Sequence, residues 1–344
     1  MLSQCQTLTK DCSMYNAAFF SDDPKQIERV YAEGRKESLL AELNFYPEFV
    51  SSQNFTQHQS ALKGLEFVFS TWGMPPLNGE QIGHLPALKA VFYAAGSVQY
   101  FARPFLQKGV QVISAWAANG VPVTHFVVAQ IVLSLKGYFT ATRICRTSQG
   151  RNNFANQYPG LFHNTISLLG AGMIGTQVIN LLKPYELNIL VFDPFLTQAR
   201  AANLGVTQVS LEEAFAQGSV VSNHIADLPE TRGMLTKNLF ESMQPYATFI
   251  NSGRGATIAE AGMLDVLARR PDLTALLDVT FPEPPLPESP IYDLENVYLS
   301  PHIAGSLGKE VLRQADYVIE EYHRLIKGEA LRYSVSLDML KTMA

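Results

Sequence analysis

The chain has 344 residues, which is enough for two domains with substantial cores and excludes a single small module. Hydrophobic residues make up 47% of the sequence and charged residues 17%, which excludes an intrinsically disordered chain. The formal net charge is −5 and no basic block occurs, so neither a nucleic-acid partner nor binding to an anionic membrane surface is expected.

The cysteines and the N-terminal segment indicate the compartment. Cys5, Cys12 and Cys145 are odd in number and lie in no CxxC or Cys/His ligand spacing, so no structural zinc or other metal is expected. The first 20 residues lack the pattern of a secretory signal, and the most apolar stretch, Val121 to Leu135, is shorter than the roughly 18 apolar residues of a spanning helix. We therefore expect a soluble, cytoplasmic protein without a membrane segment.

The first third alternates short apolar runs with polar or helical stretches, which is typical of a parallel α/β sheet. The runs that predict strands are Leu65–Thr71, Leu88–Gly96 and Val110–Trp116. A helix is then expected from about Val123 to Tyr138, apolar over too much of its surface for a one-sided surface helix. It is followed by a polar segment, Thr147 to Asn164, which we interpret as an extended arm.

The second half repeats the strand–helix alternation more clearly and predicts six strands of a doubly wound sheet. They are Thr165–Gly170, Leu187–Asp193, Ser219–Ile225, Ala247–Ser252, Thr274–Val279 and Val297–Ser300. A final helix is expected from about Lys309 to Lys327, closed by Gly328.

These elements predict an α/β protein with two doubly wound parallel-sheet domains. Residues 123–304 would form an inner dinucleotide-binding domain of the Rossmann type. Residues 1–122 and 305–344 would form a flavodoxin-like substrate domain from both ends of the chain, because the final helix can return to the first domain.

The motif GAGMIG follows the apolar strand at 166–169 and opens a helix. Its glycines Gly170, Gly172 and Gly175 permit a tight turn, a close approach of pyrophosphate and close helix packing, while the helix N-terminus attracts phosphate. Asp193 ends the next strand and stands where an acid binds the ribose hydroxyls of NAD, which disfavours NADP. Read alone, Asp193 could instead be a turn acid before a proline.

Three polar residues follow successive predicted strands in the second half. Arg254 can clamp a carboxylate with two hydrogen bonds, and Glu283 and His302 suggest an imidazole oriented by a carboxylate. Taken singly, Arg254 could be a surface ion-pair partner, Glu283 a solvated loop acid and His302 a helix N-terminal residue.

The sequences INSGRG, LLDVTFPEPP and LSPHIAGS, together with GAGMIG, resemble the D-isomer-specific 2-hydroxyacid dehydrogenases, the group that contains phosphoglycerate dehydrogenase, glyoxylate and hydroxypyruvate reductase and D-lactate dehydrogenase. The resemblance extends from about Ala94 to Gly328. It implies hydride transfer between NAD and a small 2-oxo or D-2-hydroxy acid. His302 would be the general acid and base, Glu283 its orienting acid, and Arg254 the substrate-binding arginine.

The resemblance also implies binding contacts. The substrate carboxylate would be held by the backbone of Gly96, Ser97 and Val98, and Asn119 matches the asparagine at the family's crossover. The remaining cofactor contacts would be made by Met173, Ile174, Ile225, Ser252, Asp278, His302 and Gly305.

Neither His125 nor His224 is expected to act as a base. His125 stands where many members of the family have a glutamate, and His224 is expected to line the cofactor groove. A homodimer joined by the apolar helix and the arm is expected. Two alternatives stay open. One is an NAD-sensing binding protein similar to the family's transcriptional co-repressors, and the other is a phosphite-type oxidoreductase.

Overall fold

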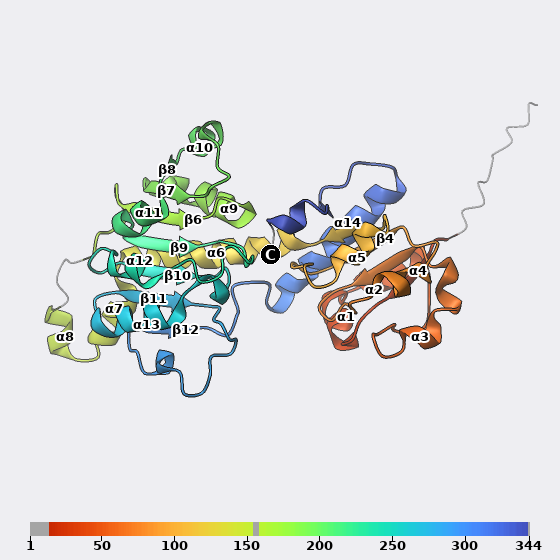
Figure 1. The fold of residues 1–344 in the computed structure, drawn as a ribbon, viewed down its shortest axis with the longest axis horizontal. Helices are drawn as coiled ribbons and strands as arrows, with labels where there is room; N and C mark the ends of the chain where they lie inside the picture. Colours follow the sequence, from red (N-terminus) through yellow and green to blue (C-terminus); the bar gives the residue numbers. More distant parts are fainter. Residues whose placement is uncertain (1–13, 154–157, 343–344) are drawn as a thin grey trace, which may run out of the picture. The chain divides into compact units, whose positions relative to one another are not determined.

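The computed structural model describes residues 14–153 and 158–342, so Cys5 and Cys12 lie outside the described residues. The chain divides into two compact units (Figure 1). Unit 1 contains the described residues up to Trp116 and residues 311–340, and unit 2 contains residues 117–310 together with 341 and 342. The boundaries thus fall at 116 and 310 instead of the predicted 122 and 304.

Unit 1 is built on a six-stranded sheet in the order β13-β5-β4-β3-β1-β2. All neighbours are parallel except β13, which pairs antiparallel with β5. The strands are β1 (Asn16–Phe19), β2 (Asn44–Phe45), β3 (Phe67–Ser70), β4 (Ala90–Tyr93), β5 (Gln111–Ser114) and β13 (Ser334–Val335). The helices are α1 (Pro24–Val30), α2 (Arg35–Glu42), α3 (Phe55–His58), α4 (Gly79–Gly83), α5 (Ala102–Gln107) and α14 (Leu312–Ile326).

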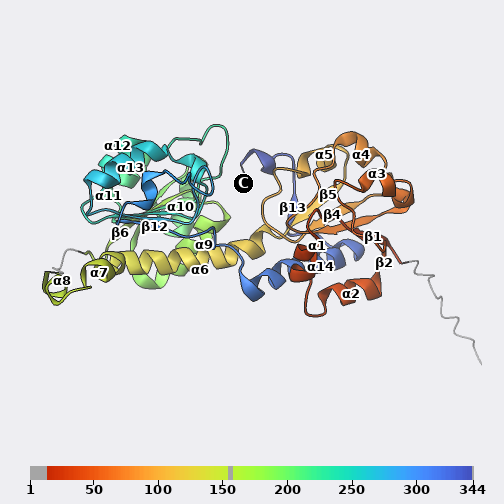
Figure 2. The same ribbon diagram turned by 90° about the horizontal axis from the view of Figure 1, so that it is seen from below.

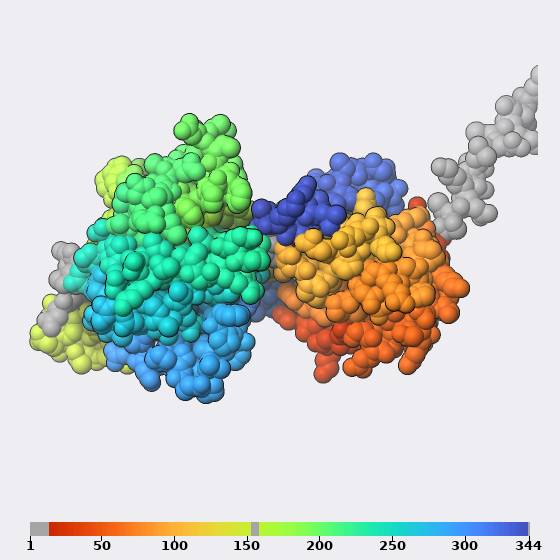
Figure 3. All heavy atoms as spheres, in the orientation of Figure 1, coloured from red at the N-terminus to blue at the C-terminus, as the bar shows by residue number. Residues whose placement is uncertain are grey.

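Helix α14 packs on this first sheet through an aromatic core. The ring of Tyr322 lies 5.8 to 5.9 Å from the rings of Phe67, Phe69 and Phe92, and Phe69 stacks on Phe92 at 4.9 Å. Both ends of the chain therefore contribute to unit 1, as the colours of Figures 2 and 3 show.

Unit 2 is built on a seven-stranded, fully parallel sheet in the order β12-β11-β10-β9-β6-β7-β8. Its strands are β6 (Thr165–Leu169), β7 (Asn188–Phe192), β8 (Thr207–Gln208), β9 (Val220–Asn223), β10 (Thr248–Asn251), β11 (Thr274–Leu277) and β12 (Val297–Leu299). Its helices are α6 (Trp116–Leu135), α7 (Tyr138–Ile144), α8 (Ser148–Asn153), α9 (Met173–Leu182), α10 (Gln198–Leu204), α11 (Leu211–Gln217), α12 (Lys237–Glu241) and α13 (Glu260–Arg269).

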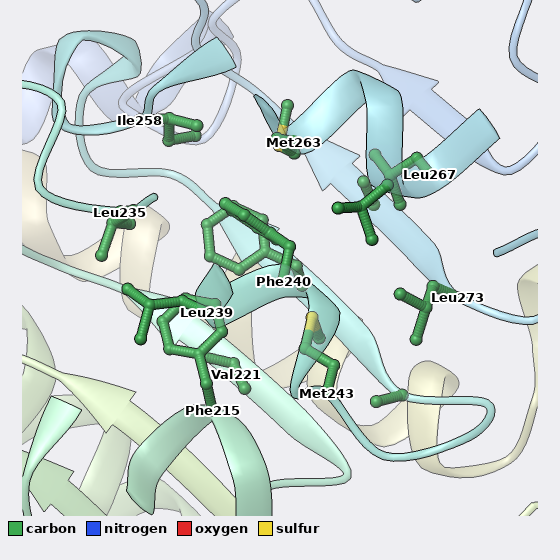
Figure 4. Close-up of a cluster of buried hydrophobic side chains, with 14 of the residues drawn as sticks. Phe215, Val221, Leu235, Leu239, Phe240, Met243, Ile258, Met263, Leu267 and Leu273 are labelled. Atoms are coloured by element: carbon green, nitrogen blue, oxygen red, sulfur yellow. The ribbon is translucent and has the colours of Figure 1, made fainter. Parts of the chain in front are cut away.

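Two apolar clusters form the core of unit 2. One gathers side chains of α11, α12 and α13 against the sheet, among them Phe215, Phe240 and Met263 (Figure 4). The other joins α6 and α9 to the sheet through Val127, Ile131 and neighbours. The predicted α/β class with two doubly wound sheets is confirmed.

Two predicted elements differ from the observed ones. The long helix α6 begins at Trp116 instead of Val123, and it ends at Leu135 because Gly137 adopts a left-handed φ of 65° before α7. The predicted arm at 147–164 includes a short helix, α8, and residues 154–157 lie outside the described residues.

With its observed length of 20 residues, α6 is apolar and long enough to cross a membrane, which the shorter predicted stretch was not. Half of its most apolar window is buried. The core helix of a soluble protein meets the same criterion, so α6 is only weak evidence for a membrane segment.

Candidate active site

The glycine loop lies at the point where the strand order of unit 2 reverses, between β6 and β9. Gly170 has a φ of 98°, and a Cβ there would lie 3.2 Å from the carbonyl oxygen of His224. A Cβ on Gly175 would lie 2.1 Å from the carbonyl oxygen of Gly170, whereas one on Gly172 would meet no atom within 4 Å. Gly170 and Gly175 are thus required by packing, and the backbone at Gly172 is open to a ligand.

Asp193 follows β7 and contacts the glycine loop directly. Its carboxylate accepts hydrogen bonds from the backbone N–H of Ala171 and of Phe195, each at 2.8 Å. Arg200 donates to the carbonyl oxygen of Ala171 at 2.6 Å and lines the same pocket. Asp193 therefore acts as a turn acid and also stands at the ligand-facing edge of the loop.

A pocket of about 310 Å³ opens beside this loop. Asp193 and Arg200 provide its charged groups, and most of the remaining lining is apolar, including Phe192, Phe195, Ile225, Leu228 and Met234. A pocket of this composition at the carboxyl edge of a parallel sheet suits a nucleoside.

His224 lines the pocket at the end of β9, as the sequence predicts. Burial lowers the pKa of His224 to about 4, and its Nε2 lies 3.1 Å from the hydroxyl of Ser222. The imidazole is therefore neutral at neutral pH and does not provide an acid.

The lowered pKa of His224 predicts that unit 2 loses stability as the pH falls from about 6.5 to 4. In this range the unfolded chain binds a proton that the native imidazole excludes. The full pKa shift lowers the free energy of unfolding by about 3 kcal/mol. Urea unfolding of the unmodified protein and of His224→Gln across this range should show a smaller loss in the variant. His84→Gln, which removes an exposed imidazole in unit 1, is the control. Equal losses in the unmodified protein and His224→Gln would contradict the prediction.

Arg254 follows β10 on a loop that a buried polar network supports. Asn223 and Asn251 end neighbouring strands in register, and the amide of Asn223 donates to the side chains of Asn251 and Thr257. Asn251 and Thr257 in turn donate to the carbonyl oxygen of Arg254, at 3.2 and 2.8 Å. The sequence analysis missed this network, although two adjacent strands that both end in asparagine are its visible signal.

The guanidinium of Arg254 remains available to a ligand. It donates to the carbonyl oxygen of Gly253 at 2.8 Å and forms no ion pair with any carboxylate of the described residues. Burial lowers the pKa of Arg254, and the charges of Asp227 and Glu283 oppose that shift. A partly buried cation that no carboxylate of the described residues engages is suited to binding an external anion.

His302 and Glu283 form the pair that the sequence predicts. Nδ1 of His302 lies 2.7 Å from Oε1 of Glu283, and both side chains are about half exposed. Nε2 of His302 makes no hydrogen bond within the described part of the chain. The imidazole is therefore held on one side and free to exchange a proton on the other.

Asp278 holds the backbone on which His302 stands. Its carboxylate is buried and accepts hydrogen bonds from the hydroxyl of Ser300 and from the N–H groups of Ile303 and Ala304, at 2.6 to 2.8 Å. His302 itself has a left-handed φ of 54°. The sequence analysis missed this supporting role, and the predicted contact of Asp278 with the cofactor stays a prediction.

The remaining predicted cofactor residues lie along the same edge of unit 2. Ser252 has a buried hydroxyl without a hydrogen-bond partner, and Met173 and Ile174 open helix α9. Near Gly305, Asn119 accepts a hydrogen bond from the N–H of Ser306 at 3.0 Å. His125 is exposed on α6 and takes no part in these contacts. No cluster of three or more potential metal ligands occurs within residues 14–153 and 158–342.

The predicted carboxylate-binding loop belongs to unit 1 and follows β4. Ser114 and Thr71 tie the carbonyl groups of residues 94–96 back to the sheet, with distances of 2.7 to 2.9 Å. The N–H groups of Gly96, Ser97 and Val98 meet no acceptor among the described residues. This loop therefore presents backbone donors of the kind that bind anions.

Comparison with known proteins identifies relatives. Residues 128–304 match the model of the D-isomer specific 2-hydroxyacid dehydrogenase, NAD binding domain. The chain is 30% identical over 232 residues to D-3-phosphoglycerate dehydrogenase of Bacillus subtilis and 28% identical over 237 residues to that of Archaeoglobus fulgidus. These matches cover 67% and 68% of this chain but only 44% of each relative, so the chain spans less than half the length of either.

Solved structures share the fold. A phosphoglycerate oxidoreductase from Rhizobium etli superimposes with a TM-score of 0.76 at 19% identity, covering 93% of this chain and 98% of the other. Rhodotorula graminis D-mandelate dehydrogenase gives a TM-score of 0.75 at 17% identity, covering 94% and 98%. The chain belongs to the family of D-isomer specific 2-hydroxyacid dehydrogenases and carries its NAD-binding domain.

Proposed function

We propose that the protein is an NAD-dependent oxidoreductase that interconverts a 2-oxo acid and a D-2-hydroxy acid, with His302 as general acid and base. The observation that carries the proposal is the 2.7 Å contact between His302 and Glu283, which leaves Nε2 of the imidazole free. Arg254, in the same unit, supplies an unpaired cation for a carboxylate.

The residues of unit 2 fit NAD. The open backbone at Gly172 and the N-terminus of α9 suit a pyrophosphate, and the pocket beside Asp193 suits an adenosine. The buried, unpartnered hydroxyl of Ser252 is a further group that a bound cofactor could satisfy.

In the proposed mechanism the reduced cofactor, when bound, supplies a hydride to the carbonyl carbon of the substrate. Arg254 binds the substrate carboxylate with two hydrogen bonds, and the N–H groups of residues 96–98 are proposed to bind it as well. Protonated His302 gives its proton to the carbonyl oxygen, and Glu283 holds the imidazole through Nδ1. Oxidation of the hydroxy acid requires the neutral imidazole instead.

A panel of 2-oxo acids with NADH tests this proposal, read as the loss of NADH absorbance. Turnover of at least one 2-oxo acid is expected. NADH binding without turnover of any acid in the panel would favour the NAD-sensing alternative, and oxidation of phosphite alone would favour the phosphite-type alternative.

Asp193 is proposed to set a preference for NAD over NADP, because its carboxylate would repel the additional phosphate of NADP. Asp193→Asn keeps an acceptor for the N–H of Ala171 and should raise kcat/KM with NADPH about tenfold relative to NADH. Steady-state rates with both cofactors measure the ratio. Equal efficiency of the unmodified protein with NADH and NADPH would contradict the assignment.

A homodimer joined through α6 and the segment that follows it is proposed as well. Apolar side chains along these segments are exposed, including Leu133 (36% exposed), Tyr138 (50%) and Phe162 (70%). Light scattering at micromolar concentration should give twice the monomer mass of 38.0 kDa. A monomer mass under these conditions would contradict it. The cytoplasmic location stays a prediction.

A further inference from the structure

The loop that follows β9 contacts the loop of Arg254 at both of its ends. At its start, a Cβ on Gly253 would lie 3.3 Å from the carbonyl oxygen of Ile225. At its end, the N–H of Gly233 donates to the carbonyl oxygen of Ala256 at 2.9 Å. The residues between these two contacts are therefore held close to Arg254 within unit 2.

Two opposite charges of the loop that follows β9 pair with each other. Nε and Nη2 of Arg232 donate to the two carboxylate oxygens of Asp227, at 2.8 and 3.2 Å, so both oxygens are engaged. The guanidinium of Arg232 also lies over the ring of Phe281, 6.0 Å from its centroid, in the loop that carries Glu283. Two separate contacts thus hold the guanidinium of Arg232 in place.

Hydrogen bonds other than this ion pair fix the fold of the loop. The hydroxyl of Thr231 donates to the carbonyl oxygen of Ala226 at 2.6 Å and accepts a hydrogen bond from the N–H of Leu228 at 2.9 Å. The side chain of Arg232 is 59% exposed, and exposed ion pairs add little to stability. The pair of Arg232 with Asp227 is therefore expected to act on neighbouring charges more than on the stability of the loop.

Asp227 is a carboxylate that can compete for Arg254. Burial lowers the pKa of Arg254, and the charge of Asp227 opposes that shift more strongly than the charge of Glu283 does. Glu283 is engaged by His302, and Asp227 is engaged by Arg232. Without Arg232, Asp227 would keep its charge on a side chain that is only 25% exposed, in a loop that contacts the Arg254 loop. An ion pair of Asp227 with Arg254 is then expected, and it would occupy the donors that a substrate carboxylate needs.

We propose that Arg232 is a positioning residue, which engages Asp227 and thereby keeps the guanidinium of Arg254 free for the carboxylate of the substrate. The proposal rests on the proposed function and deepens it. It gives Arg232 an electrostatic role that needs no contact between Arg232 and the substrate.

Arg232→Ala should raise KM for a 2-oxo acid about fivefold and change kcat by less than about twofold. The released carboxylate of Asp227 pairs with Arg254 in the free enzyme, and a bound substrate displaces it before the chemical step. Steady-state kinetics with NADH and a 2-oxo acid that the unmodified protein reduces gives both constants. Arg269→Ala is the matched control with no expected change, because Arg269 is 53% exposed and also pairs with carboxylates, those of Glu241 and Asp265.

Combining Arg232→Ala with Asp227→Asn tests the cause of the effect. The double variant should return KM to within about twofold of the unmodified value, since asparagine has no charge to pair with Arg254. Asp227→Asn alone should not raise KM. If KM stayed raised in the double variant, Arg232 would contact the substrate itself and the proposal would be overturned. An unchanged KM in Arg232→Ala would also overturn it and would leave the proposed function in place.

The affinity for NADH is a readout that does not depend on turnover. Leu228 and Thr231 of the same loop line the nucleoside pocket, so a displaced loop would weaken NADH binding. In Arg232→Ala the dissociation constant of NADH, measured by fluorescence titration, should stay within about twofold of the unmodified value. A larger loss of NADH affinity would overturn the proposal in favour of a structural role for Arg232. If the unmodified protein reduced no 2-oxo acid, the proposed function would fail and the role of Arg232 with it.

Discussion

Replacing His302 with alanine is expected to lower kcat for 2-oxo acid reduction by roughly 10² to 10⁴. The substitution removes the imidazole whose Nδ1 is held by Glu283 and whose Nε2 is free to give a proton to the carbonyl oxygen. Neither His125, exposed on α6, nor His224, whose pKa is lowered to about 4, can replace it as an acid at neutral pH. Steady-state kinetics with a 2-oxo acid that the unmodified protein reduces measures the loss.

The pH dependence of the two reaction directions separates a proton-transfer role from a structural one. Reduction requires protonated His302 and should slow as the pH rises, whereas hydroxy-acid oxidation requires neutral His302 and should slow as the pH falls. Both dependences should disappear in the residual activity of His302→Ala, and the affinity for NADH, measured by fluorescence titration, should stay within a few-fold. If His302→Ala reduced 2-oxo acids as fast as the unmodified protein across the pH range, the assignment of His302 as the acid would be wrong.

The glycine loop could be predicted from local sequence, and the pairing of Glu283 with His302 could be predicted from the order of the strands that precede them. A strand, three glycines and a helix follow one another directly at Gly170, and an acid ends the next strand at Asp193. Glu283 and His302 each follow a strand of one parallel sheet, whose carboxyl ends meet at one edge. Topology therefore brings these residues together although 19 positions separate them.

The supporting residues could not be predicted because their roles depend on tertiary contacts. Asp278 is predicted as a cofactor contact on the resemblance alone, yet its carboxylate is occupied by the loop that carries His302. The network of Asn223, Asn251 and Thr257 depends on the register of β9 against β10, which a sequence pattern does not specify.

The strands that the sequence analysis missed are β1, a four-residue strand inside the first sheet, and three shorter strands at sheet edges. β2, β8 and β13 have two residues each, too few for a recognisable alternation. β13 is further held by Glu321 of α14, a buried carboxylate that accepts hydrogen bonds from the N–H groups of Arg332 and Tyr333. This contact joins segments that no local pattern relates.

Replacing Arg254 with alanine is expected to raise KM and to lower kcat together, with a loss in kcat/KM of roughly 10² to 10³. The guanidinium would both bind the substrate carboxylate and orient the carbonyl group toward the proton donor, so its loss affects binding and the chemical step. Arg254→Lys keeps the charge but not the planar pair of donors and should recover only part of the activity.

Two further measurements assign the effect to substrate contact. NADH affinity should be little changed in Arg254→Ala, because the loop backbone is held by Asn251 and Thr257 and not by the guanidinium. Arg269→Ala, which removes an exposed arginine from helix α13 of the same unit, should retain full activity. If Arg254→Ala raised KM alone and left kcat unaltered, the residue would bind substrate and transition state equally, and its proposed part in orienting the carbonyl group would have to be given up.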